Sequence, residues 1–267
     1  MRIPDAPATS MNDIPEIDIR RELLPRHSSV IEALYRLSKQ VSVEEWVLVG
    51  GLMVLVLGRE HDGRSSRAEG TKDADVLVDI VTNSAVLDNV TQALLGQGFD
   101  LASDLGSSNQ DWGRCTFVFG RAQIDVLCPD DADTNALDTK DGLRSLVIPG
   151  GRRALQTARH IDLYFSDNFA NVRLRVPSLA GAIVTKGAAA TDKRTALSSR
   201  HIQDLAFLLT LSARPLNLLD ELTDDDLKML EQLDARIHDN RDAAWEHLDP
   251  NQRDLAQAAY NLIVRRR

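Results

Sequence analysis

The stretch from Trp46 to Asp79 constrains the fold of this chain most strongly, because strand, turn, helix and acidic signals follow one another within it. Trp46–Val49 is a short apolar run that ends at Gly50-Gly51, and the apolar, helix-forming segment Leu52–Leu57 comes next. This order predicts a buried strand, a tight glycine turn and a helix whose N-terminus faces the turn. The unpaired N–H groups and partial positive charge of such a helix start favour phosphate binding.

A pair of carboxylates follows this unit. After a polar loop, Asp73 and Asp75 stand at the entrance of a strand that is apolar from Val76 onward. Side chains two residues apart in extended backbone point to the same face, so the two carboxylates converge and their repulsion requires a cation. An isolated Asp-x-Asp is typical of a solvated turn. The glycine turn upstream of the pair makes an ion-binding interpretation the stronger one here.

A third carboxylate lies in a predicted β-hairpin. The runs Arg114–Phe119 and Gln123–Leu127 flank Gly120-Arg121, and the second run places Asp125 among apolar residues. An uncompensated carboxylate in a sheet is costly, so Asp125 should be paired or bound to a metal ion. Three oxygen-donor carboxylates suit Mg²⁺, with Mn²⁺ as the alternative, and Mg²⁺ also takes substrate phosphates as ligands.

These motifs resemble those of a known superfamily. A glycine pair, then an Asp-x-Asp, then a later Asp resemble the signature of the nucleotidyltransferases; the residues are Gly50, Gly51, Asp73, Asp75 and Asp125. A second region narrows the resemblance. Leu179–Lys186, Lys193 and Arg200–Leu205 are together similar to the helical elements of AbiEii/MenT-type nucleotidyltransferase toxins. The resemblance covers roughly residues 45–210.

The resemblance implies an α+β fold, in which a small mixed β-sheet flanked by helices precedes a C-terminal helical bundle. Residues 1–20 have no clear hydrophobic period, which predicts a mobile or surface-draped arm. We expect a catalytic domain at 21–176 and a helical domain at 177–267. The catalytic residues would be Asp73, Asp75, Asp125, Lys186 and Asp204, the first three also binding the metal. The nucleotide-binding residues would be Gly50, Gly51, Lys72, Lys186 and Lys193.

Two of these assignments have simpler alternatives. Lys186 lies three residues after Ile183 and seven after Leu179, on the stripe that faces inward, so its charge must reach water or meet an anion. The triphosphate is the anion that the resemblance implies, whereas a solvated helix face is the ordinary place for lysine. Asp204 lies four residues after Arg200, so a simple helical ion pair would also explain it.

Composition bounds the class of protein. The chain has 267 residues, 43% of them hydrophobic and 27% charged, which is ordinary for a globular protein. Its two cysteines argue against a disulfide scaffold. No segment approaches the roughly 20 apolar residues of a membrane span, and the first residues lack the layout of a secretory signal. We therefore expect a cytoplasmic protein without membrane association.

The charge distribution is uneven. A net charge of −9 argues against a broad nucleic-acid-binding surface. Basic residues nevertheless concentrate in the middle third: Arg144, Arg152, Arg153, Arg159, Arg173, Arg175, Lys186, Lys193, Arg194 and Arg200. This asymmetry predicts an anionic substrate beside the middle segment.

The function that the resemblance implies is the transfer of a nucleoside monophosphate from an NTP to the 3′ end of a tRNA. The protein would act as the toxin of a toxin–antitoxin system, with a cognate antitoxin as partner. A small-molecule nucleotidyltransferase, of the kind that modifies aminoglycosides or lincosamides, is the enzymatic alternative. A non-catalytic pseudo-nucleotidyltransferase that binds a nucleotide or a partner protein is the alternative from another class.

Overall fold

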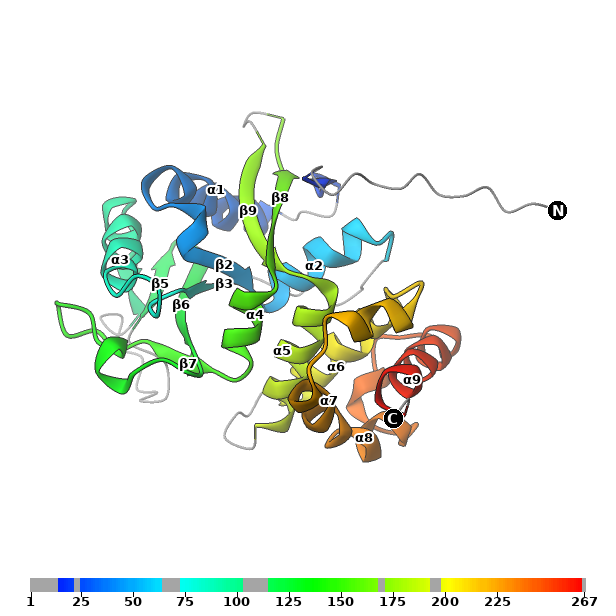
Figure 1. The fold of residues 1–267 in the computed structure, drawn as a ribbon. Helices are drawn as coiled ribbons and strands as arrows, with labels where there is room; N and C mark the ends of the chain where they lie inside the picture. Colours follow the sequence, from blue (N-terminus) through cyan, green and yellow to red (C-terminus); the bar gives the residue numbers. More distant parts are fainter. Residues whose placement is uncertain are drawn as a thin grey trace.

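The computed structural model describes residues 14–21, 25–63, 73–102, 115–167, 171–192 and 198–265, without the side chains of 25–28 and 198. The fold is α+β, with the helices of the last third following the sheets (Figure 1). The strands are β1 (Glu16–Asp18), β2 (Trp46–Val49), β3 (Asp73–Val78), β4 (Asp100–Leu101), β5 (Thr116–Phe119), β6 (Ala122–Pro129), β7 (Leu146–Ile148), β8 (Ala158–Tyr164) and β9 (Val172–Pro177). The helices are α1 (Pro25–Gln40), α2 (Gly50–Glu60), α3 (Val86–Gly96), α4 (Gly151–Gln156), α5 (Leu179–Thr191), α6 (Ser198–Thr210), α7 (Asp224–Glu231), α8 (Asp234–His238) and α9 (Pro250–Val264).

The larger sheet is mixed and has six strands in the order β2-β3-β6-β5-β4, with β7 also paired to β6. Its centre is the parallel pair β3 and β6, while β2 and β5 run antiparallel to their neighbours. The register places Val49 opposite Asp75 and Asp75 opposite Asp125. This pairing therefore gathers the end of β2 and two acidic positions on neighbouring strands.

The smaller sheet has three strands in the order β1-β8-β9. Its presence corrects one prediction, because the segment assigned to a mobile arm through residue 20 belongs to the fold from Ile14 onward. Ile17 and Ile19 are buried, and β1 pairs in parallel with β8. The alternating isoleucines bury apolar area that offsets the cost of ordering this short segment.

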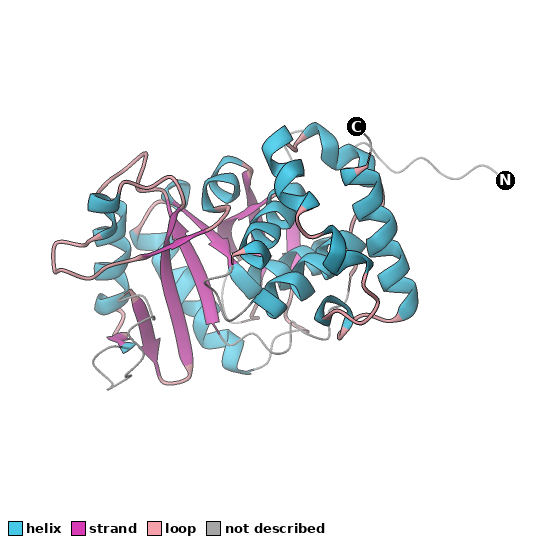
Figure 2. Ribbon diagram, turned by 90° about the horizontal axis from the view of Figure 1, so that it is seen from below, coloured by secondary structure: helices cyan, strands magenta, loops and turns pink. Residues whose placement is uncertain are grey.

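One continuous hydrophobic core joins the sheets to the C-terminal helices. Helix α5 lies between the two parts: it contacts α4 and β9 on the sheet side and α6 and α7 on the other, so most of its residues are buried. Figure 2 shows a large group of helices at one side of the strands, near the C-terminus, and further helices on the opposite side. None of the helices in the described part of the chain combines the length and apolar character that crossing a membrane requires.

Several predicted elements are confirmed. The strand at Trp46–Val49 has the predicted bounds, and β5 and β6 form the predicted hairpin. Strand β3 begins at Asp73, earlier than the predicted start at Val76, because the ladder with β6 extends back to Asp73. Asp73 is thus its first residue, and Asp75 lies within it.

Candidate functional site

The turn between β2 and α2 lies directly against the carboxylate of Asp75. Gly50 has φ +70°, a backbone conformation that side chains disfavour. A Cβ atom placed on Gly50 would lie 1.6 Å from Oδ2 of Asp75. Glycine at position 50 therefore serves two purposes: it makes the turn and leaves room for the carboxylate.

Asp125 lies beside Asp75 on the neighbouring strand. The two are register partners in the parallel pair of β3 and β6, so their side chains share one face of the sheet. Asp73, two residues before Asp75, is on that face as well. Gly50, Gly51 and the three aspartates are all partly exposed, so a ligand can reach this face of the sheet.

Two polar side chains hold Asp125 in place. The hydroxyl of Thr116 donates to Oδ1 of Asp125 at 2.6 Å, and the amide of Gln123 donates to Oδ2 at 3.0 Å. Neither residue was predicted as part of the site. The hairpin itself carries the signal, because a two-residue turn at Gly120-Arg121 pairs Phe119 with Ala122 and hence Thr116 with Asp125.

Lys186 and Asp204 form a buried ion pair between α5 and α6. The Lys186 Nζ atom lies 2.8 Å from Oδ2 of Asp204, and each side chain is only 6% exposed. The prediction that Lys186 faces inward and meets an anion is consistent with this pair. The anion that Lys186 meets here belongs to the protein, since Asp204 reaches across from the neighbouring helix.

The electrostatics of Asp75 connect these residues into one cluster. Burial and the negative charge of Asp125 raise the pKa of Asp75 to about 7; Lys186 opposes this shift, and Asp73 and Asp204 add to it. Burial also raises the pKa of Asp125, against the hydrogen bonds from Thr116 and Gln123. The predicted catalytic residues therefore lie within electrostatic reach of Asp75.

Two predicted residues, Lys72 and Lys193, lie outside the described residues. Gly51 lies in the first turn of α2, immediately after Gly50.

The donor set of this cluster suits a divalent cation. Carboxylate oxygens are the ligands that Mg²⁺ and Mn²⁺ prefer. Asp75 and Asp125 lie side by side on one face of adjacent strands. A bound cation would also offset the repulsion that raises the pKa of Asp75. Among the described residues, no three Asp, Glu, His or Cys side chains are arranged closely enough to hold a metal ion in their present conformations. Binding would therefore require side-chain rotation or ligands from the substrate.

The raised pKa predicts how the stability of the metal-free protein depends on pH. The pKa of Asp75 is about 7 in the folded protein, against about 4 in an unfolded chain. The stability that its bound proton contributes is thus fully present below about pH 4 and is lost as the pH rises through about 7. Urea unfolding in the presence of a chelator should show a steeper fall for the wild type than for Asp75→Asn, which keeps only the raised pKa of Asp125. Parallel curves for the two proteins would contradict the assignment.

Most of the basic residues of the middle third have an acidic partner in the described part of the chain. Those that the structure describes with an ion-pair partner are Arg144 with Asp138, Arg152 with Asp131, Arg153 with Asp226, Arg159 with Glu60, Arg173 with Asp162, Arg175 with Glu44, and Lys186 with Asp204. Each partner reduces the positive potential that a distant anion would feel. The predicted binding of an anionic substrate beside the middle segment therefore receives little support from these residues.

Comparison with known proteins yields no match: no protein-family model fits this chain, and no curated protein is similar to it in sequence. The chemistry of the cluster must therefore be inferred from its own residues. Those residues are a glycine turn at a helix start, neighbouring carboxylates on one sheet face, and a buried lysine beside them.

Proposed function

We propose that this protein is a metal-dependent nucleotidyltransferase that moves a nucleoside monophosphate from an NTP to an acceptor hydroxyl. The observation that carries the proposal is the contact between the Asp75 carboxylate and Gly50 at the start of α2, with Asp125 on the next strand. A triphosphate seat and a divalent-cation site would thus be adjacent, which is what nucleotidyl transfer requires.

Each residue has a role in this proposal. Asp73 and Asp75 would hold the cation that accompanies the nucleotide, and Asp125 would share a second cation or accept the proton of the acceptor hydroxyl. Bound cations would stabilise the charge that develops on the transferred phosphoryl group and on the departing diphosphate. Gly50 and Gly51 would let the backbone approach the β- and γ-phosphates.

Lys186 and Asp204 would act as a unit. The Lys186 ammonium would neutralise triphosphate charge while Asp204 keeps it oriented, since the two groups are already 2.8 Å apart. A lysine ammonium has three donors, so it can serve the carboxylate and a phosphate oxygen together.

The resemblance to AbiEii/MenT-type toxins makes a tRNA 3′ end the first candidate acceptor, with toxin activity as its consequence. A small-molecule acceptor is the second candidate, and the ion-paired arginines of the middle third favour it. RNA binding by counterion release needs cations that are available to phosphates, whereas a small acceptor does not.

Incubating the protein and Mg²⁺ with each labelled NTP decides between these acceptors. One set of reactions receives total RNA and the other receives aminoglycoside and lincosamide antibiotics, with Asp75→Asn as the control. Label on RNA would identify a tRNA-type acceptor, and label on an antibiotic would identify the small-molecule class. NTP binding without transfer to any acceptor would contradict the enzymatic proposal and favour a nucleotide-binding pseudo-enzyme.

Thr116 provides a test of the role of Asp125. Thr116→Val keeps the side-chain volume but removes the hydroxyl that donates to Asp125 at 2.6 Å. Because a displaced catalytic group loses its alignment, kcat should fall about ten- to a hundredfold with little change in the KM for NTP. Thr116→Ser should restore most of the activity. Wild-type kcat in the valine variant, or equal loss in the serine variant, would contradict this role.

A further inference from the structure

The residues on either side of Lys186 are held by two different helices. Thr185 packs under Gly150 at the N-terminal cap of α4: a Cβ on Gly150 would lie 3.0 Å from Cα of Thr185. Gly187 packs on α7, where its Cβ would lie 2.9 Å from Leu230 Cδ2 and 3.2 Å from Met229 Cε. Residues two apart, such as Thr185 and Gly187, point in directions that differ by about 200° around a helix. Helices α4 and α7 therefore contact nearly opposite sides of α5 at the level of Lys186.

The hydroxyl of Thr185 adds polar contacts to this packing. Its hydroxyl lies 2.8 Å from the carbonyl oxygen of Gly181 within α5 and 3.3 Å from that of Gly150. Helix α5 therefore has little freedom to slide or rotate while α4 and α7 stay in place.

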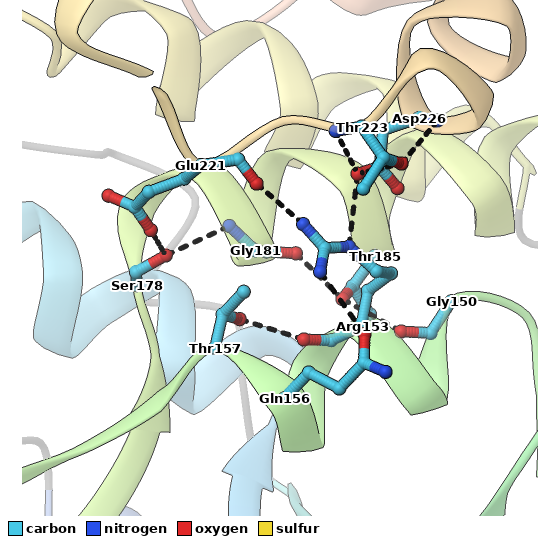
Figure 3. Close-up of polar contacts among 10 residues, drawn as sticks. All are labelled: Gly150, Arg153, Gln156, Thr157, Ser178, Gly181, Thr185, Glu221, Thr223 and Asp226. Atoms are coloured by element: carbon cyan, nitrogen blue, oxygen red, sulfur yellow. Dashed lines mark hydrogen bonds and ion pairs between the residues drawn. The ribbon is translucent and has the colours of Figure 1, made fainter. Parts of the chain in front are cut away.

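Arg153 joins α4 to α7, as Figure 3 shows. Its Nε atom lies 3.0 Å from Oδ2 of Asp226 in the first turn of α7, and its Nη2 atom donates to the carbonyl oxygen of Glu221 at 2.6 Å. Asp226 is only 5% exposed, and the same carboxylate accepts hydrogen bonds from Thr223 in the capping box of α7. One guanidinium thus bridges α4, the helix cap and the loop before it.

The same loop also contacts the start of α5. The Ser178 hydroxyl donates to Oε2 of Glu221 at 2.5 Å and accepts from the backbone N–H of Gly181 as the N-cap of α5 (Figure 3). The planar guanidinium of Arg153 can serve a carboxylate and a carbonyl at fixed angles, which a lysine ammonium cannot reproduce. Polar contacts therefore connect α4, α5 and α7 to one another around Lys186.

We propose that Arg153 is a positioning residue for Lys186. By tying α4 to the loop and cap of α7, Arg153 fixes helix α5 and with it the place of the Lys186 ammonium beside Asp75. The catalytic consequence of this inference rests on the proposed function. The structural link that Arg153 makes between α4 and α7 does not depend on it.

Hydrogen exchange tests, without any activity assay, whether the contacts of Arg153 restrain helix α5. Arg153→Met should raise the exchange rates of the amides at 182–190 about tenfold or more, because local opening of α5 becomes easier. Arg152→Met is the matched control: Arg152 is the adjacent residue of α4, but it is 52% exposed and pairs with Asp131. Equal exchange at 182–190 in the two variants would overturn the proposal.

A second variant separates positioning from the cost of an unpaired buried charge. Arg153→Met leaves the Asp226 carboxylate without the guanidinium, whereas Arg153→Met with Asp226→Asn removes that charge and keeps an oxygen to accept from Thr223. Both proteins should show kcat/KM for NTP about tenfold below the wild type. Full activity in the double variant would mean that Arg153 serves stability alone and would overturn the proposal.

Coupling to Lys186 completes the test. If Arg153 acts through Lys186, Arg153→Met should lower kcat/KM about tenfold in the wild-type background and less than twofold in a Lys186→Met background. Additive losses would contradict positioning. An inactive wild-type protein would instead refute the proposed function, while the exchange experiment would still decide whether the tie exists.

Discussion

Gly50→Ala should unfold the site and lower the free energy of unfolding by about 3 kcal/mol or more. The new Cβ would meet Oδ2 of Asp75 at 1.6 Å and Cγ at 2.5 Å, and the backbone at φ +70° would be strained as well. Relief requires the Asp75 carboxylate or the start of α2 to move, and either movement separates the proposed phosphate seat from the proposed cation site. Urea unfolding measures the first effect and nucleotidyl transfer measures the second.

Gly142→Ala is the matched control for this substitution. Gly142 has φ +77°, and no atom lies within 4 Å of the position its Cβ would take. Its replacement therefore isolates the conformational cost of a left-handed residue, about 1 kcal/mol. If Gly50→Ala costs no more than Gly142→Ala, the close contact between the turn and Asp75 is wrong.

Lys186→Met should have the second large effect. The methionine removes the charge that compensates Asp204, and breaking a buried ion pair costs about 3–5 kcal/mol. Transfer activity should fall about a hundredfold, the scale of one lost transition-state contact. Thermal or urea unfolding and steady-state kinetics measure the two losses separately.

Lys186→Met with Asp204→Leu distinguishes these two losses. Replacing both charges with apolar side chains should recover most of the stability, because neither charge of this pair is then left without its partner. Activity should stay low, since the ammonium is absent. Lys228→Met, which breaks an exposed pair with Asp225, should leave the unfolding midpoint unchanged. Recovery of activity in the double variant would contradict a role for Lys186 in catalysis.

The centre of the sheet could be predicted from local sequence signals. The apolar run before Gly50, the alternation around Asp75 and the hairpin around Gly120 each specify backbone over a few residues, and strand alternation then assigns the faces. Asp75 and Asp125 therefore fall on the predicted sheet face. The pairing of Thr116 with Asp125 could have been predicted in the same way, because the two-residue turn of the hairpin sets the register of its strands.

The contacts between distant segments could not be predicted in this way. Helical spacing offers Asp204 a local partner at Arg200, but packing of α6 on α5 brings it to Lys186. Similarly, Ile17 and Ile19 alternate over too few residues to indicate a strand until β8 is present to pair with them. Several middle-third arginines show the same limit, because their acidic partners are distant in sequence, as Glu44 is from Arg175 and Glu60 is from Arg159.

The most direct test of a metal-dependent nucleotidyl-transfer site is the anomalous-scattering map of crystals grown with Mn²⁺ and a non-hydrolysable NTP. We expect a Mn²⁺ peak within about 2.5 Å of carboxylate oxygens from both Asp75 and Asp125, with the triphosphate extending toward the start of α2 at Gly50. A nucleotide bound elsewhere, or carboxylates of Asp75 and Asp125 more than about 8 Å apart with no Mn²⁺ between them, would contradict the proposed site.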